Sequence, residues 1–514
     1  MDAALPESVI LSGQRRLPKP DLDRHAAQAA QGFADLGIGA NDAVALFLRN
    51  DFAFFEASFA ASLLGAYPVP VNWHYTPDEA GYVLRDCNAK AVIAHADLLP
   101  QLEGVIPEGC QLFVVETPPE IIDAYGLDPA VAHVPDGLTN WQTWLAAHPA
   151  WRGTPAALRG TMIYTSGTTG RPKGVRKEPQ TPQMQALAQA MAATLFDIRS
   201  DPPLRTVVTG PMYHTAPNGY AMAAVRYGGY VVLQPRFSTE GLLADIEQHR
   251  ISHIHMVPTM FVRLLALDEA EKKRFDLSSL KHVVHGAAAC PADVKRAMIE
   301  WWGPVVHEYY AMTETGFIAI SNSEDWLRYP GSVGRAAQGV IIQTRREDGT
   351  QCEPGEPGEI FVHSETTGHV AYLHAEEKTA ELRHGDFIAT GDIGYLNEDA
   401  FLFISDRKTD MVISGGVNIY PAEVEQALIG MDGIRDCAVF GVPHPEFGEQ
   451  LVAAIQPAAG VTLSQENVQA FLKGRISSYK VPRIVRVCDH FPREDSGKVK
   501  KHKLRQSLFG EIAA

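Results

Sequence analysis

The sequence predicts an α/β fold, with a large N-terminal domain of layered β-sheets and helices and a small C-terminal α+β domain. Three observations lead to this prediction. Helix-like and strand-like segments alternate over residues 22–94 and 207–306, which is typical of parallel sheets covered by helices. Over residues 331–404 the strand-like segments are short and separated by Gly, Pro and Asp, as in antiparallel sheets. A fresh set of elements then begins, so we place the domains at 1–408 and 409–514.

The first elements follow helical and extended patterns in turn. Apolar residues recur at helical spacing from Leu22 to Gly37, and Ala43 to Leu48 has the composition of a short buried strand. The alternation continues with a helix over 52–65, a strand over 68–71, a helix over 76–87 and a strand over 91–94. Residues 116–136 are richer in Pro and show no period, so we expect a surface excursion there.

Later elements are expected at the following positions. In the large domain, strands are predicted over residues 230–233, 253–257 and 282–284. In the small domain, the sequence predicts a first strand, a helix opening at Tyr420-Pro421, a strand over 437–442, a helix over 464–476 and a strand over 484–487.

Charge and apolar content exclude several classes of protein. The chain has 514 residues with 45 Lys plus Arg against 61 Asp plus Glu, a net charge of −16, which disfavours nucleic acid and anionic membranes as partners. No apolar run reaches the roughly 18 residues of a membrane span or the roughly 7 of a signal-peptide core, so we expect a cytoplasmic protein. Six single cysteines without ligand spacing suggest neither a disulfide framework nor a zinc site.

The segment Tyr164–Val175, YTSGTTGRPKGV, carries the clearest chemistry. Its glycines allow close backbone approach, and its hydroxyls and lysine offer donors and a cation to a polyphosphate. It is not a Walker A motif, because Pro172 precedes the lysine and Gly174 follows it. The candidate phosphate-binding residues are Thr165, Ser166, Gly167, Thr168, Thr169, Gly170 and Lys173.

This segment resembles the phosphate-binding signature of the adenylate-forming superfamily, which contains acyl-CoA and aryl-CoA synthetases, nonribosomal adenylation domains and luciferases. Further motifs agree in order and spacing from about residue 22 to about residue 505. They are PMYH (211–214), HGAAA (285–289), YYAMTE (309–314), PGSVGR (330–335), TGDIGYLNEDAFLFISDRKTD (390–410), ISGGVNIYPAEVE (413–425) and REDSGKVKK (493–501). Chance agreement of so many motifs is improbable, and the resemblance places the chain among the AMP-forming acid:CoA ligases.

The resemblance implies roles for residues around the nucleotide. Tyr310 is expected to stack on adenine, with Gly286, Ala287 and Ala288 covering the other face. Asp392 is expected to bind the ribose hydroxyls, and Arg407 to add a donor to the same sugar.

A second group of residues is expected at the reacting atoms. Thr313 matches the α-phosphate contact, and Glu314 matches the carboxylate that holds Mg²⁺, which prefers hard oxygen ligands. His214 aligns with the aromatic position beside the substrate carboxylate. Lys498 resembles the catalytic lysine, whose ammonium relieves the repulsion between carboxylate and α-phosphate.

In the family, ATP converts the acid to acyl-AMP and a thiol then displaces AMP. The small domain rotates between the two steps and presents the loop with Gly415 and Gly416, which lines the pantetheine tunnel. ATP, Mg²⁺ and coenzyme A are therefore the expected cofactors and co-substrates. Two positions depart from the family pattern: Ala311 replaces a glycine, and Thr409 occupies the hinge position that is commonly Asp or Lys.

The acid itself stays open. No acidic residue near PMYHTAPNGYAM would pair with a substrate amine, which favours a hydrophobic monocarboxylic acid: fatty, steroid-side-chain or aryl, such as a hydroxycinnamic acid. The stretches 218–222, 283–288 and 309–317 are candidate walls of its pocket. Alternatives are a stand-alone adenylase that loads a carrier protein, a luciferase-type oxygenase and a non-catalytic binding homologue. The sequence does not fix the oligomeric state, and a homodimer is compatible with it.

Overall fold

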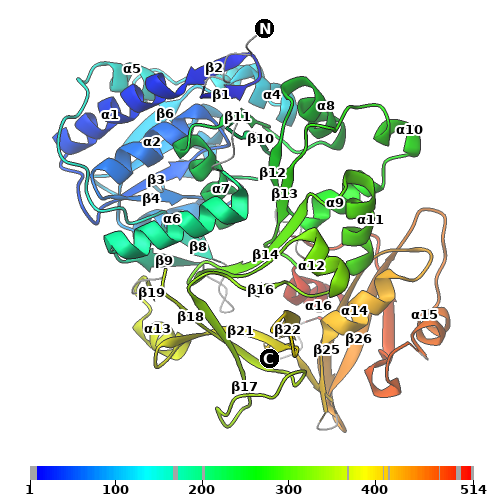
Figure 1. Cartoon of the computed structure of the whole chain (residues 1–514). Helices are drawn as coiled ribbons and strands as arrows, with labels where there is room; N and C mark the ends of the chain where they lie inside the picture. The colour runs from blue at the N-terminus through cyan, green and yellow to red at the C-terminus, as the bar shows by residue number, and fades with distance from the viewer. Residues whose placement is uncertain are drawn as a thin grey trace.

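The computed structural model describes residues 8–165, 172–198, 203–366, 370–408, 410–414, 417–473, 475–493 and 499–510. It shows a large N-terminal α/β domain and a smaller C-terminal domain, which confirms the predicted fold class (Figure 1). The first sheet is entirely parallel, in the order β4-β3-β5-β6-β7. Its strands are β3 (Ala43–Phe47), β4 (Tyr67–Pro70), β5 (Ala89–His95), β6 (Gln111–Val115) and β7 (Thr139–Asn140).

The nine-stranded second sheet has the order β16-β15-β14-β13-β12-β10-β11-β1-β2. Its six middle strands, β14 through β1 in this order, are parallel, and antiparallel strands close both edges. The strands are β1 (Val9–Ser12), β2 (Arg15–Pro18), β10 (Arg205–Val208), β11 (Tyr230–Leu233), β12 (His253–Met256), β13 (His282–His285), β14 (Val306–Met312), β15 (Gly316–Ser321) and β16 (Arg335–Ala336). The carboxyl ends of the parallel strands are where loops with polar residues gather in such sheets.

Helices cover the two parallel sheets (Figure 1). The helix α3 starts with a capping box between Thr76 and Glu79 and has Pro77 in its first turn. The helices of the large domain are α1 (Lys19–Asp35), α2 (Phe52–Leu63), α3 (Pro77–Asp86), α4 (Pro119–Tyr125), α5 (Trp141–Ala146), α6 (Pro182–Phe196), α7 (Thr215–Arg226), α8 (Thr239–His249), α9 (Pro258–Leu265), α10 (Glu269–Lys272), α11 (Ala292–Trp302), α12 (Ser323–Arg328) and α13 (Glu376–Leu382).

Two antiparallel sheets complete the large domain. Strands from residues 331–404 contribute to both, as expected, and residues 163–177 add two strands that the sequence did not predict. A three-stranded sheet joins β8 (Ile163–Thr165), β9 (Lys173–Lys177) and β19 (Val370–Tyr372), so chain segments far apart in sequence lie side by side. The other sheet contains β17 (Val340–Arg345), β18 (Gly358–Ser364), β20 (Arg383–His384), β21 (Phe387–Leu396) and β22 (Leu402–Arg407).

The C-terminal domain is built on a sheet of order β24-β23-β26-β25, with β27 beside β26. Its central strand β26 (Gly448–Pro457) was not predicted from the sequence. The other elements are β23 (Val412–Ser414), β24 (Val417–Ile419), α14 (Pro421–Ile429), β25 (Ile434–His444), α15 (Gln465–Leu472), β27 (Ile484–Val487) and α16 (Lys501–Phe509).

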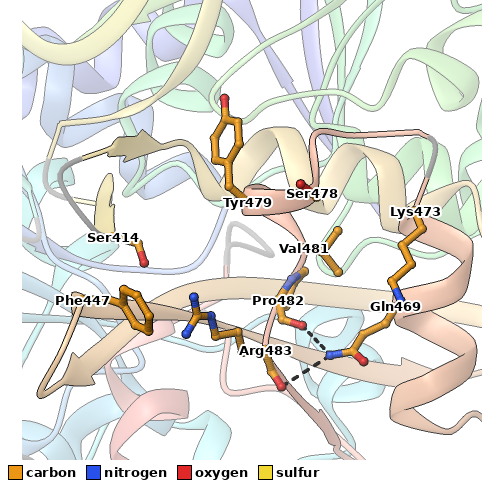
Figure 2. A pocket seen from close by; sticks show the side chains of 9 residues that line it. All are labelled: Ser414, Phe447, Gln469, Lys473, Ser478, Tyr479, Val481, Pro482 and Arg483. Atoms are coloured by element: carbon orange, nitrogen blue, oxygen red, sulfur yellow. Dashed lines mark hydrogen bonds between the residues drawn. The ribbon is translucent and has the colours of Figure 1, made fainter.

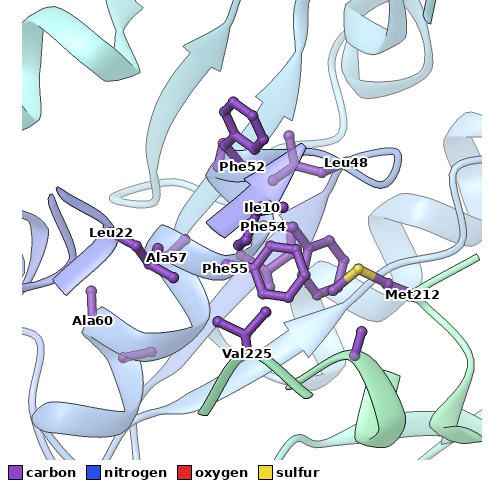
Figure 3. Packing of buried hydrophobic residues seen from close by; sticks show 14 of the residues in the cluster. Ile10, Leu22, Leu48, Phe52, Phe54, Phe55, Ala57, Ala60, Met212 and Val225 are labelled. Carbon is purple, nitrogen blue, oxygen red and sulfur yellow. The ribbon is translucent and has the colours of Figure 1, made fainter. Parts of the chain in front are cut away.

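The main core lies where the two parallel sheets meet. Every residue of α2 from Phe52 to Ser58 is buried, and its phenylalanines pack among side chains from both sheets. Figure 3 shows Met212 and Val225, from the second sheet's side, close to Phe54 and Phe55 of this helix. Burial of an aromatic side chain contributes about 1.5–3 kcal/mol, so this cluster holds the two sheets in a fixed relation.

The predicted surface excursion at residues 116–136 is partly wrong. It contains the short helix α4, in which Ile121 and Ile122 are buried. The Arg15 guanidinium donates to Glu120 of this helix at 2.6 Å, which ties α4 to the end of the second sheet. A helix of seven residues is too short to show a period in the sequence.

Candidate active site

Three of the predicted nucleotide-binding residues converge from three strands. Asp392 on β21 lies opposite Arg407 in the antiparallel ladder with β22, and the Arg407 Nε is 3.6 Å from the Asp392 Oδ1. The Tyr310 hydroxyl, from β14, donates a short hydrogen bond to the Asp392 Oδ2. Burial raises the pKa of Tyr310 well above its usual value, and the neighbouring Asp392 carboxylate adds to the effect, so the phenol stays neutral. The carboxylate of Asp392 retains acceptor capacity for sugar hydroxyls.

The predicted strip 286–288 follows directly after β13. Gly286 lies so close to Tyr309 that a Cβ atom there would be 2.7 Å from its ring and 2.9 Å from its backbone oxygen. Ala287 has a φ of +68°, a left-handed conformation that is uncommon for residues with a side chain. The strip is therefore a tight turn pressed against β14, where backbone can approach a flat ligand closely.

Glu314 lies among donors from the three-stranded sheet. Its carboxylate is buried, and its Oε1 accepts a hydrogen bond of 2.7 Å from the Tyr372 hydroxyl. The Lys173 ammonium is 5.8 Å from the centre of the Tyr372 ring. Lys173 stands opposite Thr165 in the pairing of β8 with β9. Because Tyr372 contacts both Lys173 and Glu314, these residues and Thr165, where the predicted phosphate loop begins, lie in one region. Tyr372 was missed by sequence reasoning, because only the pairing of β19 with β9 places it here.

One carboxylate with phosphate and water oxygens around it is a common setting for Mg²⁺. Glu314 fits this pattern, since its second oxygen is not used by Tyr372. Among the described residues no group of three or more His, Cys, Asp or Glu side chains could form a separate metal site.

His214 is the N-cap residue of α7 and follows the loop after β10. Its ring centroid is 4.4 Å from that of Tyr213. The hydroxyls of Thr215 and Thr313 are 3.1 Å apart, so the His214 loop meets the YYAMTE segment directly. The arrangement brings the predicted carboxylate-side residue and the predicted α-phosphate contact to one place.

The three stretches predicted to line the acid pocket also converge. The ring centroids of Tyr309 and Phe317 are 5.2 Å apart. The Tyr309 hydroxyl is 2.8 Å from the His255 Nε2, and the ring centroid of Tyr220 is 5.6 Å from that of His255. Burial lowers the pKa of His255 to about 4, so this imidazole is neutral at pH 7. Tyr309 and Tyr220 are buried packing residues of the main core in this structure.

Several predicted residues lie outside the part of the chain that the structure describes. They are Ser166, Gly167, Thr168, Thr169, Gly170, Thr409, Gly415, Gly416 and Lys498; of Thr165 only the backbone is described.

A cavity of about 380 Å³ opens in the C-terminal domain beside Ser414, the last described residue before 417 (Figure 2). The Arg483 guanidinium carbon lies 3.8 Å from the centre of the Phe447 ring on one wall. Gln469 lies beside Arg483 and donates to the backbone oxygen of Pro482 at 2.9 Å (Figure 2). The wall therefore combines aromatic faces with cations. Its lining is Ser414, Phe447, Gln469, Lys473, Ser478, Tyr479, Val481, Pro482 and Arg483. Apart from Ser414, which belongs to the segment ISGGVNIYPAEVE, no sequence motif contains these residues.

Comparison with known proteins identifies the family. The model of the AMP-binding enzyme family matches residues 3–370, and that of the AMP-binding enzyme C-terminal domain matches residues 423–498. The chain therefore belongs to the AMP-binding enzyme family. Among the described helices, none combines the length and the apolar composition needed to cross a membrane.

Individual relatives support the predicted class. A feruloyl-CoA synthase of an Amycolatopsis species is 31% identical over 502 residues, covering 97% of this chain and 95% of that protein. A long-chain-fatty-acid–CoA ligase of Mycobacterium tuberculosis is 29% identical over 506 residues, covering 97% and 94%. The structure of ATP-bound MatB from Rhodopseudomonas palustris matches with a TM-score of 0.84 at 26% identity, covering 100% of this chain and 97% of that one. The prediction of an ATP-dependent acid:CoA ligase is confirmed.

Proposed function

We propose that this chain activates a hydrophobic monocarboxylic acid with ATP to give acyl-AMP and then transfers the acyl group to coenzyme A. The observation that carries the nucleotide half is the convergence of Tyr310, Asp392 and Arg407 from three strands. In this proposal Asp392 accepts the ribose hydroxyls, Arg407 donates to the same sugar, and adenine lies between Tyr310 and the strip 286–288. The names of the relatives, a feruloyl-CoA synthase and a fatty-acid ligase, support an acid of aryl or fatty type.

The phosphates would lie at the three-stranded sheet. Lys173 and the loop 165–170 supply a cation and donors to the triphosphate, and Thr313 contacts the α-phosphate. Glu314 would hold Mg²⁺, which neutralises part of the triphosphate charge when bound. The buried hydrogen bond from Tyr372 fixes one oxygen of Glu314 and leaves the other for the metal.

The acid would lie beside His214, between the nucleotide and the main core. Its carboxylate attacks the α-phosphorus, and the bond to the pyrophosphate oxygen breaks. Lys498 offers its ammonium to the two approaching anions, whose repulsion is the main electrostatic obstacle.

Coenzyme A would then use the C-terminal domain. The cavity beside Ser414 offers an aromatic face and the cations of Arg483 and Lys473, which suit the adenine ring and phosphates of coenzyme A. The loop with Gly415 and Gly416 would line the path of its pantetheine arm. We further propose that the boundary between the two domains lies at 408/409 and that the C-terminal domain rotates about Thr409. We also propose that the protein is cytoplasmic, and a homodimer is compatible with these proposals.

AMP release measured with ATP and Mg²⁺, with and without coenzyme A, tests the function. The panel holds ferulic acid, hexadecanoic acid, a steroid-side-chain acid and indole-3-acetic acid. AMP that appears only with coenzyme A and with one class of acid supports the ligase and names its substrate class. Acid-dependent pyrophosphate exchange without thioester formation would point to a carrier-protein acceptor, and no exchange at all would contradict the proposal.

Lys498→Ala separates the two half-reactions. Loss of a positioned charge that acts on the transition state costs on the order of 10²-fold or more in rate, so acid-dependent pyrophosphate exchange should fall by at least that factor. Thioester formation from supplied acyl-AMP should stay within about threefold. Lys503→Ala, on the neighbouring exposed face of α16, is the control and should change neither rate. Equal losses in both half-reactions would overturn the role of Lys498.

A further inference from the structure

The loop that carries His214 lacks a sheet partner at Met212, and both backbone polar groups of Met212 are satisfied by asparagine side chains. The Met212 N–H donates to the Asn50 Oδ1 at 2.8 Å. The Asn218 Nδ2 donates to the Met212 carbonyl at 3.0 Å. Asn50 makes a second bond, from its Nδ2 to the carbonyl of Gly210 at 2.9 Å.

The orientation of the Asn50 amide is fixed by these partners. A backbone N–H can only donate and a carbonyl can only accept, so a flipped amide would place donor against donor and acceptor against acceptor. Asn50 is 6% exposed and Asn218 is 4% exposed, so no water competes freely for these groups. Losing one partner would leave buried polar groups without a hydrogen bond.

Asn50 is itself held on both sides. The N–H of Arg49 donates to the His95 Nδ1 at 3.1 Å, and the His95 Nε2 lies 3.2 Å from the Asp51 Oδ2. These contacts anchor the segment after β3 to β5 of the same sheet. Asn50 therefore projects from a rigid part of the first sheet toward the second sheet.

The loop that Asn50 holds also contacts the candidate active site. The N–H of His214 donates to the carbonyl of Pro211 at 3.1 Å, within the turn that Asn50 clamps. The next residue, Thr215, meets Thr313 at 3.1 Å. The Met212 side chain enters the core cluster around α2, as Figure 3 shows.

We infer that Asn50 is a positioning residue for adenylation: it links the carboxyl ends of the two parallel sheets and fixes the loop that places His214 and Thr215 beside Thr313. Asn218 supports the same loop from the other side through Met212 and is itself held by a 3.2 Å hydrogen bond from the Thr161 hydroxyl. The inference rests on the proposed function, because it concerns the acid side of that site.

Asn50→Ala and Asn50→Asp test the inference. The aspartate variant keeps the shape and the acceptor for Met212 but loses the donor to Gly210, so a loss of activity cannot come from a cavity. With the best acid of the panel, we expect kcat for acid-dependent pyrophosphate exchange to fall at least tenfold in both variants. The KM for ATP should stay within twofold, since Asn50 does not touch the residues around Asp392, and thioester formation from supplied acyl-AMP should stay within threefold.

Trp141→Phe is the matched control. Trp141 is fully buried in the same core cluster and donates to the Glu56 Oε2 at 2.7 Å, away from the His214 loop. Rates corrected for the folded fraction should be unchanged in this variant. Unchanged kcat in the Asn50 variants, or equal losses in all three variants, would overturn the positioning role. Absence of acid-dependent exchange in the wild-type chain would overturn the proposed function and, with it, this inference.

Discussion

At the residue scale, Lys173 and Lys378 show how neighbouring charges set the state of a phosphate-binding cation. Desolvation, followed by the neighbouring ammonium of Lys378, lowers the pKa of Lys173 to about 8, while Glu381 opposes the shift. Both neighbours belong to α13, which follows β19 of the three-stranded sheet. A lysine with this pKa is charged at pH 7 and loses its proton above pH 8.

The loss of this proton above pH 8 predicts that ATP binding depends on pH. As the pH rises from 7 to 9.5, Lys173 loses its charge and the KM for ATP should rise about tenfold, as expected for losing one charge-assisted contact. Lys378→Ala removes the like charge and raises the pKa of Lys173, so the increase in KM should move to higher pH. Lys378→Arg keeps the charge and should keep the wild-type profile. A flat profile would remove Lys173 from the triphosphate contacts.

Site residues could be predicted from the sequence only where they lie in a recognisable motif. Tyr310, Asp392 and Arg407 could be predicted because each lies in a recognisable segment, and the structure brings them together. Tyr372 and Asn50 could not, because their partners come from strands and loops far away in the sequence. Their isolated side chains carry no local signal.

At the element scale, the contact between α11 and β14 is held by a buried ion pair. The Lys295 ammonium on α11 donates to the Glu308 carboxylate on β14 at 2.6 Å, and Lys295 is fully buried. Burial lowers the pKa of Lys295 and raises that of Glu308, while their mutual attraction opposes both shifts. Glu308 lies two residues before Tyr310 on β14, so the ion pair adjoins the part of this strand that is proposed to bind the nucleotide.

Breaking this pair on one side should be costly. Lys295→Met leaves the buried Glu308 carboxylate without its ammonium partner, and we expect the free energy of unfolding to fall by about 3–5 kcal/mol in urea denaturation. Lys295→Met combined with Glu308→Leu removes both charges and should recover most of that loss. If the single and double variants were equally destabilised, packing and not the lone charge would explain the effect.

Among the strands buried on both faces, β3 and β11 were predicted from the sequence and β26 was missed. The predicted ranges for β11 and β27 agree with the structure. In β26, Leu451, Ala453 and Ile455 enter one core cluster and Val452 and Ala454 enter another. Such a strand has no alternation of apolar and polar residues, and its run LVAAI resembles any short buried segment.

At the scale of the whole molecule, the sites proposed for the nucleotide and for coenzyme A lie in different domains. The cavity beside Ser414 and the Asp392 site belong to parts of the chain with separate core clusters. The order of the two domains and their fold classes could be predicted from the change in pattern after residue 404. The cavity could not, because its wall joins residues from β23, the turn before β26, α15 and the segment before β27.

Arg483→Ala tests the assignment of the cavity. Losing a charge-assisted contact of about 1.5–3 kcal/mol should raise the KM for coenzyme A at least tenfold. Acid-dependent pyrophosphate exchange, which does not need coenzyme A, should stay unchanged. Arg486→Ala is the matched control, because Arg486 is also exposed, lies three residues further on and does not line the cavity. A parallel rise in both variants would indicate a general charge effect instead of this cavity.

The pairing of β9 with β19 has a consequence for biosynthesis. Val370 stands opposite Lys177, and Tyr372, which holds Glu314, comes from the same late strand. During translation the early strands β8 and β9 cannot pair with β19 until nearly two hundred intervening residues have left the ribosome. A nascent or prematurely terminated chain that ends before residue 370 therefore lacks Tyr372 and one strand of the sheet that carries Lys173.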